Sequence, residues 1–144
     1  MAVHPDHPEP VGACVLSPPS NFLHQLQEHG TLSEEMLILS LIGVRKLAAV
    51  AVDPEHRAHA VGQALLRRST TLAFATGITT VFGQVRTSDN LDGWYRKNGY
   101  AVFAPAHALD LSWLYNRPTA LGPPAGEQII AAMPNGKIPR SIAR

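Results

Sequence analysis

The chain has 144 residues, of which 45% are hydrophobic and 16% are charged, and its formal net charge is +1. A chain of this length and composition can bury one core without disulfides or metals, which excludes a largely disordered protein. The nearly balanced charge excludes a global attraction to nucleic acid or to an anionic membrane, so any anion site must be local.

The first third of the sequence predicts a loose arm followed by two elements. Residues 1–10 hold three prolines together with His4 and His7, which we expect to be solvated. Residues 11–17 predict a short strand that ends at the following Pro-Pro pair. Residues 21–30 carry apolar side chains at helical spacing and end in a glycine, which predicts a short helix.

The segment from residue 36 to residue 54 contains two apolar runs separated by Gly43, Val44 and Arg45. A hairpin with a glycine-containing turn explains this pattern, and its second strand would run from Lys46 to Val52. Pro54 would end that strand, because proline has no N–H for a strand ladder.

From Val61 the apolar period becomes helical, and Gly77 is a suitable end for this helix. The rest of the chain predicts a strand over 78–85, a short helix over 91–98, and a final pair of strands over 100–105 and 107–115. From Arg117 onward the high proline and glycine content predicts a tail or an extended arm.

This order of elements predicts a single α/β domain, with a mixed sheet and helices packed on its faces. We place the domain at residues 1–116 and the tail at residues 117–144. The single Cys14 excludes an internal disulfide framework and fits a reducing compartment. No apolar run approaches the roughly 20 residues of a bilayer span. No secretion signal is recognisable at residues 1–10. We therefore expect a soluble cytoplasmic protein.

The loop between Val52 and the helix at Val61 carries the clearest chemical signal. A strand, a small-residue loop and a helix point several backbone N–H groups at one place, where the helix dipole adds positive potential. Arg57 and His59 would lie at its mouth, and Gly62 would let a ligand approach the backbone. A diphosphate would suit this charge, although a simple polar start of the helix explains the loop equally well.

Two known phosphate loops do not match. A Walker loop requires a Gly-Lys-Ser/Thr run, which the sequence lacks, and a dinucleotide fingerprint requires three spaced glycines where the chain has only Gly62. Instead, Arg57-Ala58-His59-Ala60-Val61-Gly62 resembles the acyl-CoA loop of the GNAT superfamily of N-acetyltransferases, Gln/Arg-x-x-Gly-x-Gly/Ala, with Ala60 where glycine is usual. Residues 90–100, NLDGWYRKNGY, resemble the second signature of that family.

The resemblance covers about Met36 to Tyr115. It implies a central, mostly antiparallel mixed sheet flanked by helices, with a front end shorter than the family's usual first strand and two helices. It further implies acetyl-CoA or another short acyl-CoA as cosubstrate, no metal, and an amine acceptor that is a small molecule or a peptide. The expected cofactor-binding residues are Ala51, Val52, Arg57, Ala58, His59, Ala60, Val61, Gly62, Gln63 and Asn90.

Tyr95 is the expected catalytic residue, because the resemblance places it near the sulfur of the thioester. A phenol with an ordinary pKa of about 10 can donate a proton to a leaving thiolate. The general base stays open among Glu34, Glu35, Glu55 and Asp110, since the strand over 46–52 has no carboxylate.

Two other classes of function remain open. One is a GNAT-like module that binds acyl-CoA or a partner without catalysis, and the other is a structural protein that assembles through its tail. Homodimerisation is a further expectation. Nucleic-acid and membrane partners are not expected.

Several remaining residues have simpler interpretations. His56 and His59 are spaced like a metal pair, but no third ligand lies nearby in the sequence, so we expect loop histidines. Cys14 is expected to be a small buried residue without nucleophilic character. Arg67 and Arg68 are expected on a solvated helix face.

Overall fold

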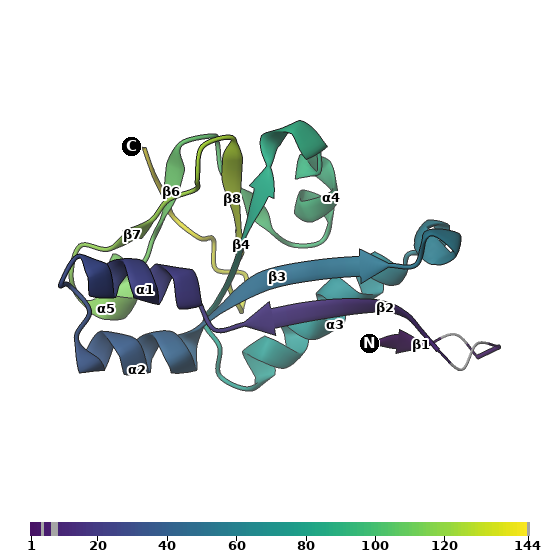
Figure 1. Cartoon of the computed structure of the whole chain (residues 1–144), viewed down its shortest axis with the longest axis horizontal. Helices are drawn as coiled ribbons and strands as arrows, with labels where there is room; N and C mark the ends of the chain where they lie inside the picture. The colour runs from purple at the N-terminus through teal and green to yellow at the C-terminus, as the bar shows by residue number, and fades with distance from the viewer. Residues whose placement is uncertain (4, 7–8, 144) are drawn as a thin grey trace.

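The computed structural model describes residues 1–3, 5–6 and 9–143 (Figure 1). His4 and His7 therefore lie outside the described residues. The expected mixed α/β fold is confirmed. A six-stranded sheet has the order β1-β2-β3-β4-β8-β5, and a three-stranded sheet has the order β7-β6-β9. Within the described residues no helix combines the length and the apolar character needed to cross a membrane.

The strands of the large sheet come from both ends of the chain. They are β1 (Ala2–Val3), β2 (Pro10–Ser17), β3 (Val44–Val52), β4 (Thr80–Arg86), β5 (Ala101–Val102) and β8 (Glu127–Ala132). All neighbouring pairs are antiparallel except β3 and β4, which run parallel. The small sheet contains β6 (His107–Asp110), β7 (Ala120–Leu121) and β9 (Ser141–Ala143).

Helices cover both faces of the large sheet. The helices are α1 (Ser20–Glu28), α2 (Glu34–Gly43), α3 (Val61–Ala75), α4 (Asp92–Lys97) and α5 (Ser112–Tyr115). One apolar core joins Phe22 and Met36 of the early helices with Phe82 of β4. A second core joins Leu66 of α3 and Tyr95 of α4 with the other sheet face. The sheet is thus the middle of three layers.

The predicted hairpin over residues 36–54 is wrong. Its first half is helix α2, and the chain enters β3 directly at Val44. The side chain of Ser33 caps α2 by accepting a hydrogen bond from the Met36 N–H at 3.1 Å, and Glu34 and Glu35 occupy the first turn. Short apolar runs do not distinguish a strand from a helix by periodicity, whereas this cap does.

The predicted final strand pair is also wrong. β5 pairs with β8, and β6 pairs with β7 and β9. The chain leaves β6 at Asp110, whose carboxylate accepts a hydrogen bond from the Ser112 N–H at 2.9 Å. This side-chain turn competes with a strand ladder and starts the short helix α5.

The expectation of a tail from Arg117 onward is not met. β8 lies between β4 and β5 in the large sheet, and Ile129, Ile130 and Ala131 are fully buried. The prolines of this segment flank the run Glu127–Ala132 and do not interrupt it. An internal strand of the sheet therefore lies within a segment whose overall composition is rich in proline and glycine. At the other end, β1 replaces part of the expected loose arm.

Candidate functional site

The parallel strands β3 and β4 pair only at their beginnings. Val44, Arg45 and Lys46 pair with Thr80, Val81 and Phe82, and the two strands then separate (Figure 1). β3 continues along β2 as far as Val52, while β4 continues along β8 as far as Arg86. The second half of β3 therefore presents an open edge toward the gap between the strands.

Backbone groups of this open edge point into the gap. The Asp53 N–H donates to the Val11 carbonyl at 2.7 Å, which fixes the direction of the antiparallel ladder. Because that ladder alternates, the N–H and C=O groups of Val50 and Val52 point away from β2. One extra residue in β3 opposite Val15 and Leu16 makes a bulge at Ala48.

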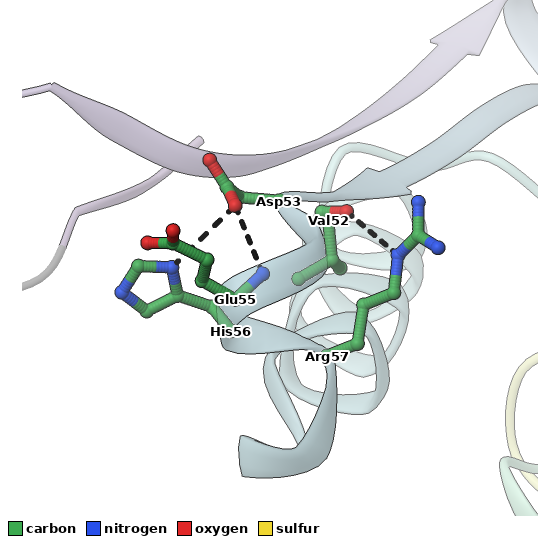
Figure 2. Close-up of polar contacts among 5 residues, drawn as sticks. All are labelled: Val52, Asp53, Glu55, His56 and Arg57. Atoms are coloured by element: carbon green, nitrogen blue, oxygen red, sulfur yellow. Dashed lines mark hydrogen bonds and ion pairs between the residues drawn. The ribbon is translucent and has the colours of Figure 1, made fainter.

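The segment that follows β3 is an ordered turn of 3-10 helix over Pro54–His59. Asp53 Oδ1 accepts a hydrogen bond from the Glu55 N–H at 3.0 Å and lies 4.0 Å from His56 Nδ1 (Figure 2). Arg57 Nε donates to the Val52 carbonyl at 3.1 Å, and the rest of its guanidinium points away from that bond (Figure 2). The turn thus holds a cation beside the end of β3.

Ala60 joins this turn to α3 in the left-handed conformation, with φ of 56°. The first helical hydrogen bond runs from the Ala64 N–H to the Ala60 carbonyl. The side chain of Ala60 cannot accept a hydrogen bond, so it leaves the N–H groups of Val61, Gly62 and Gln63 uncapped. The beginning of α3 combines these donors with the positive end of its dipole.

A cavity of about 790 Å³ joins the open edge of β3, the turn, the beginning of α3 and the beginning of α4. Of the expected site residues, seven line this cavity: Ala51, Val52, Arg57, Ala60, Gly62, Gln63 and Tyr95. The wall is completed by Val50, Asp89, Leu91 and Trp94, which were not among the expected site residues. Val50 could have been found from strand alternation with Val52, whereas Asp89 has no local signal.

Gly62 lies where α3 comes closest to β3 and α4. A Cβ at this position would lie 3.4 Å from Val52 Cγ2 and 3.6 Å from Trp94 Cζ2. Both neighbours line the cavity. The absent side chain of Gly62 therefore widens the cavity beside the free N–H groups of α3.

Tyr95 is almost completely buried, and its ring meets Trp94 edge to face at a centroid distance of 4.9 Å. No hydrogen bond from its hydroxyl to another described side chain is formed. Burial raises the pKa of Tyr95, and the nearby Cys14 and Asp89 raise it further. The phenol is therefore protonated throughout the neutral range and could donate a proton into the cavity.

Three of the expected binding residues whose side chains are described do not line this cavity: His59, Val61 and Asn90. His59 belongs to the turn, and Val61 begins α3. The backbone of Ala58 belongs to the same turn as His59. Asn90 is left-handed, with φ of 53°, and lines a neighbouring cavity with Thr87 and Arg96. Its chain neighbours Asp89 and Leu91 line the first cavity, so Asn90 lies at the border between the two cavities.

The four carboxylates considered as general bases lie away from the cavity lining. Glu34 and Glu35 begin α2, and Glu55 belongs to the turn. Asp110 lines a different cavity with Lys137 and Arg140, and hydrogen bonds from Ser112 lower its pKa. Among the described residues, Asp89 is the carboxylate that lines the cavity beside Tyr95.

Arg67 does not simply face solvent as expected. Its Nε donates to Asn98 Oδ1 at 3.0 Å, and its Nη2 donates to the Lys97 carbonyl at 3.1 Å. Asn98 is buried and donates in turn to the Trp94 carbonyl at 2.8 Å. These bonds attach the end of α4 to α3, so Arg67 helps to hold Trp94 and Tyr95 in place.

Cys14 is half-buried on β2, as expected for a residue of an apolar strand. Burial raises the pKa of its thiol, which opposes a nucleophilic role. The rings of His56 and His59 lie 6.3 Å apart. Within the described part of the chain, no group of three or more potential metal ligands gathers around them.

The family model of the GNAT acetyltransferase domain matches residues 9–102. The chain belongs to the GNAT acetyltransferase family. Among the curated proteins, no sequence matches this GNAT chain. The family match begins earlier and ends earlier than the expected range from Met36 to Tyr115.

Solved GNAT structures share this fold at low sequence identity. A Bacillus subtilis acetyltransferase in complex with CoA aligns with a TM-score of 0.55 and 14% identity, over 92% of this chain and 73% of its own. An acyl-CoA N-acyltransferase from Klebsiella pneumoniae aligns with a TM-score of 0.52 and 20% identity, over 90% of this chain and 67% of its own. A GNAT-family protein from Desulfovibrio desulfuricans aligns with a TM-score of 0.51 and 18% identity, over 92% of this chain and 64% of its own. The chain thus spans less than two thirds of the length of that last relative.

Proposed function

We propose that this GNAT chain transfers an acetyl or short acyl group from acyl-CoA to a primary amine by direct attack in a ternary complex. The observation that carries this proposal is the 790 Å³ cavity, which joins the open edge of β3, the free N–H groups of α3, Arg57 and Tyr95. The relative from Bacillus subtilis with the same fold contains CoA, which supports the choice of cosubstrate.

The residues of the cavity suit the parts of acyl-CoA in order. The N–H groups at the beginning of α3 and the guanidinium of Arg57 would hold the pyrophosphate, since both present donors to an anion. The outward N–H and C=O groups of Val50 and the outward N–H of Val52 would pair with the amides of the pantetheine arm, as an added strand would. The Val52 carbonyl is already the acceptor of Arg57 Nε. Tyr95 would then lie beside the thioester.

The chemistry requires a neutral amine and a protonated leaving group. An ammonium acceptor first loses a proton to water or to a base, for which Asp89 is the candidate in the cavity wall. The amine nitrogen then forms a bond to the acyl carbon while the carbon–sulfur bond breaks. Tyr95 donates its proton to the departing thiolate, and the proton released by the new amide restores the phenol through solvent. Positioning of the two reactants supplies much of the rate.

A second candidate function is an acyl-CoA-binding module without catalysis. The observation that favours it is the absence of any carboxylate on β3, which carries only Arg45 and Lys46 as charged residues. Such a module would bind acyl-CoA and would release no CoA with any amine. Turnover therefore separates the two candidates.

The deciding experiment is a calorimetric titration with acetyl-CoA, CoA and dephospho-CoA, followed by an assay of CoA release with a panel of amines. Saturable binding together with amine-dependent CoA release is the expected result. Binding without release would favour the module. The absence of binding to all three compounds would remove both candidates.

A further inference from the structure

A second, much smaller cavity lies where β3 and β4 begin to separate. It has a volume of about 30 Å³ and is lined by nine residues: Pro19, Asn21, Phe22, Gln25, Lys46, Phe82, Gln84, Leu121 and Gly122. Phe22 and Phe82 belong to the core on the α1 and α2 side of the sheet, whereas Tyr95 belongs to the core on the other side. The two cavities therefore approach the gap between β3 and β4 from opposite faces.

Lys46 is the charged residue of this small cavity. It pairs with Phe82 in the last register position before the two strands separate. The side chain is half-buried. Within the described chain no carboxylate forms an ion pair with Lys46. The charge of Lys46 is therefore available to an anionic group of a ligand.

The polar groups around Lys46 are amides. Gln84 of β4 is half-buried, and Asn21 and Gln25 of α1 lie exposed at the mouth. None of these three side-chain amides forms a hydrogen bond to another described residue. The cavity thus combines one cation with unused amide donors, and no carboxylate lines it.

The size of the cavity suits one small polar group. The accessible volume of about 30 Å³ exceeds the roughly 10–15 Å³ that a buried water molecule requires, so the cavity has room for a small polar group such as a carboxylate. A carboxylate would accept hydrogen bonds from Lys46 and from the amide of Gln84, which are charge-assisted and strong. An ammonium group would instead face the positive charge of Lys46.

We propose that the acceptor amine carries a carboxylate close to its nitrogen, as an amino acid does, and that Lys46 with Gln84 binds this carboxylate. The inference rests on the proposed acyl transfer, which places the acyl carbon in the gap between β3 and β4. The amine enters from the face of α1, opposite Tyr95, and the bound carboxylate orients its nitrogen toward that gap. Lys46 is a specificity-determining residue in this arrangement and takes no part in proton transfer.

The test compares matched acceptors with wild-type protein. Small amino acids are paired with their amides, and spermidine represents the polyamines. The amides are the more reactive nucleophiles in solution at pH 8, because a larger share of their amine is neutral. We expect kcat/KM for each amino acid to exceed that of its amide by at least tenfold, which is the reverse of their order of reactivity in solution.

Variants of Lys46 identify the source of the preference. K46Q should lower kcat/KM for the amino acids at least tenfold and change it less than twofold for the amides. K46R should retain most of the preference, and K46E should reverse it in favour of the amides and spermidine. K137Q, which changes a lysine on another cavity, is the matched control and should leave all of these ratios unchanged.

The outcomes distinguish this inference from the proposed function. Efficient transfer to amides or spermidine but not to amino acids would overturn the carboxylate site and leave the acyltransferase intact. Equal losses for acids and amides in K46Q would also overturn it, because a merely structural lysine would act in that way. Failure of acetyl-CoA to bind in calorimetry would remove the proposed function itself, and this inference with it.

Discussion

Arg57 Nε donates a hydrogen bond to the carbonyl oxygen of Val52 across 3.1 Å, so that the turn after β3 closes back on the end of that strand. The bond fixes the side chain and leaves the terminal nitrogens of its guanidinium available (Figure 2). A cation is thus held in place beside the free N–H groups of α3 before any ligand arrives, which reduces the entropy lost on binding.

Replacing Arg57 with glutamine is expected to weaken acetyl-CoA binding about tenfold, or about 1.4 kcal/mol, because one charge-assisted contact to the pyrophosphate is lost. Calorimetry at two salt concentrations measures the effect, and wild-type affinity should depend more strongly on salt. R68Q changes an exposed arginine of α3 that does not line the cavity, and this variant should bind acetyl-CoA with wild-type affinity. Equal affinities of R57Q and R68Q would contradict the assigned role.

Replacing Tyr95 with phenylalanine is expected to lower kcat by about 10²-fold, the low end of general acid catalysis. The dissociation constant of acetyl-CoA should change less than twofold. Because burial raises the pKa of Tyr95 above the ordinary value, the wild-type rate should persist to alkaline pH before the phenol ionises. Y100F is the control, since the Tyr100 hydroxyl contacts Thr70 and does not line the cavity. An unchanged kcat in Y95F would remove Tyr95 from the mechanism.

Replacing Ala60 with glycine is expected to stabilise the protein by roughly 0.5–1 kcal/mol, because the left-handed conformation strains alanine and does not strain glycine. The same substitution at Ala64, an exposed helical position two residues after Gly62, should destabilise by about 1 kcal/mol. Urea denaturation measures both values. Changes of the same sign in A60G and A64G would contradict the strain assigned to φ of 56° at Ala60.

Replacing Arg67 with alanine is expected to lower the free energy of unfolding by about 1–3 kcal/mol, since the buried Asn98 loses the donor to its Oδ1. R68A removes the neighbouring exposed arginine and should change stability by less than about 0.5 kcal/mol. Denaturant titration of the two variants tests the difference. Equal stabilities would mean that the bonds to Asn98 and Lys97 do not hold α4 to α3.

The pKa of Tyr100 is raised to about 12, first by burial, while the hydrogen bond with Thr70 lowers it. The unfolded chain therefore loses this proton at a lower pH than the folded protein does. The corresponding stability is present below pH 10 and is lost as the pH rises toward 12, up to about 2–3 kcal/mol in total. Denaturation at pH 9 and pH 11.5 measures the loss, which should be smaller in Y100F. An equal loss in both proteins would assign it to other groups.

Much of the candidate site follows from local sequence signals. Pro54 ends a strand, the helical period begins at Val61, and Ala60 before that helix offers no side-chain cap, so the turn and the uncapped beginning of the helix could be predicted from this stretch alone. A second local signature, at residues 90–100, is the basis for expecting Tyr95 at the site. The cavity lining brings together seven of the residues expected from these two segments.

The remaining features depend on contacts between distant segments. Local signals were sufficient for the helix at Val61, the turn before it and the mixed α/β class, because caps, breakers and apolar periods act over a few residues. The direct passage from helix α2 into β3, the place of β8 between β4 and β5, and the contribution of Asp89 and Trp94 to the cavity wall became clear only in the folded chain. The position of Lys46 depends on tertiary structure in the same way. The point where β3 and β4 separate is defined by strand pairing, and the sequence of either strand alone does not predict its pairing partner.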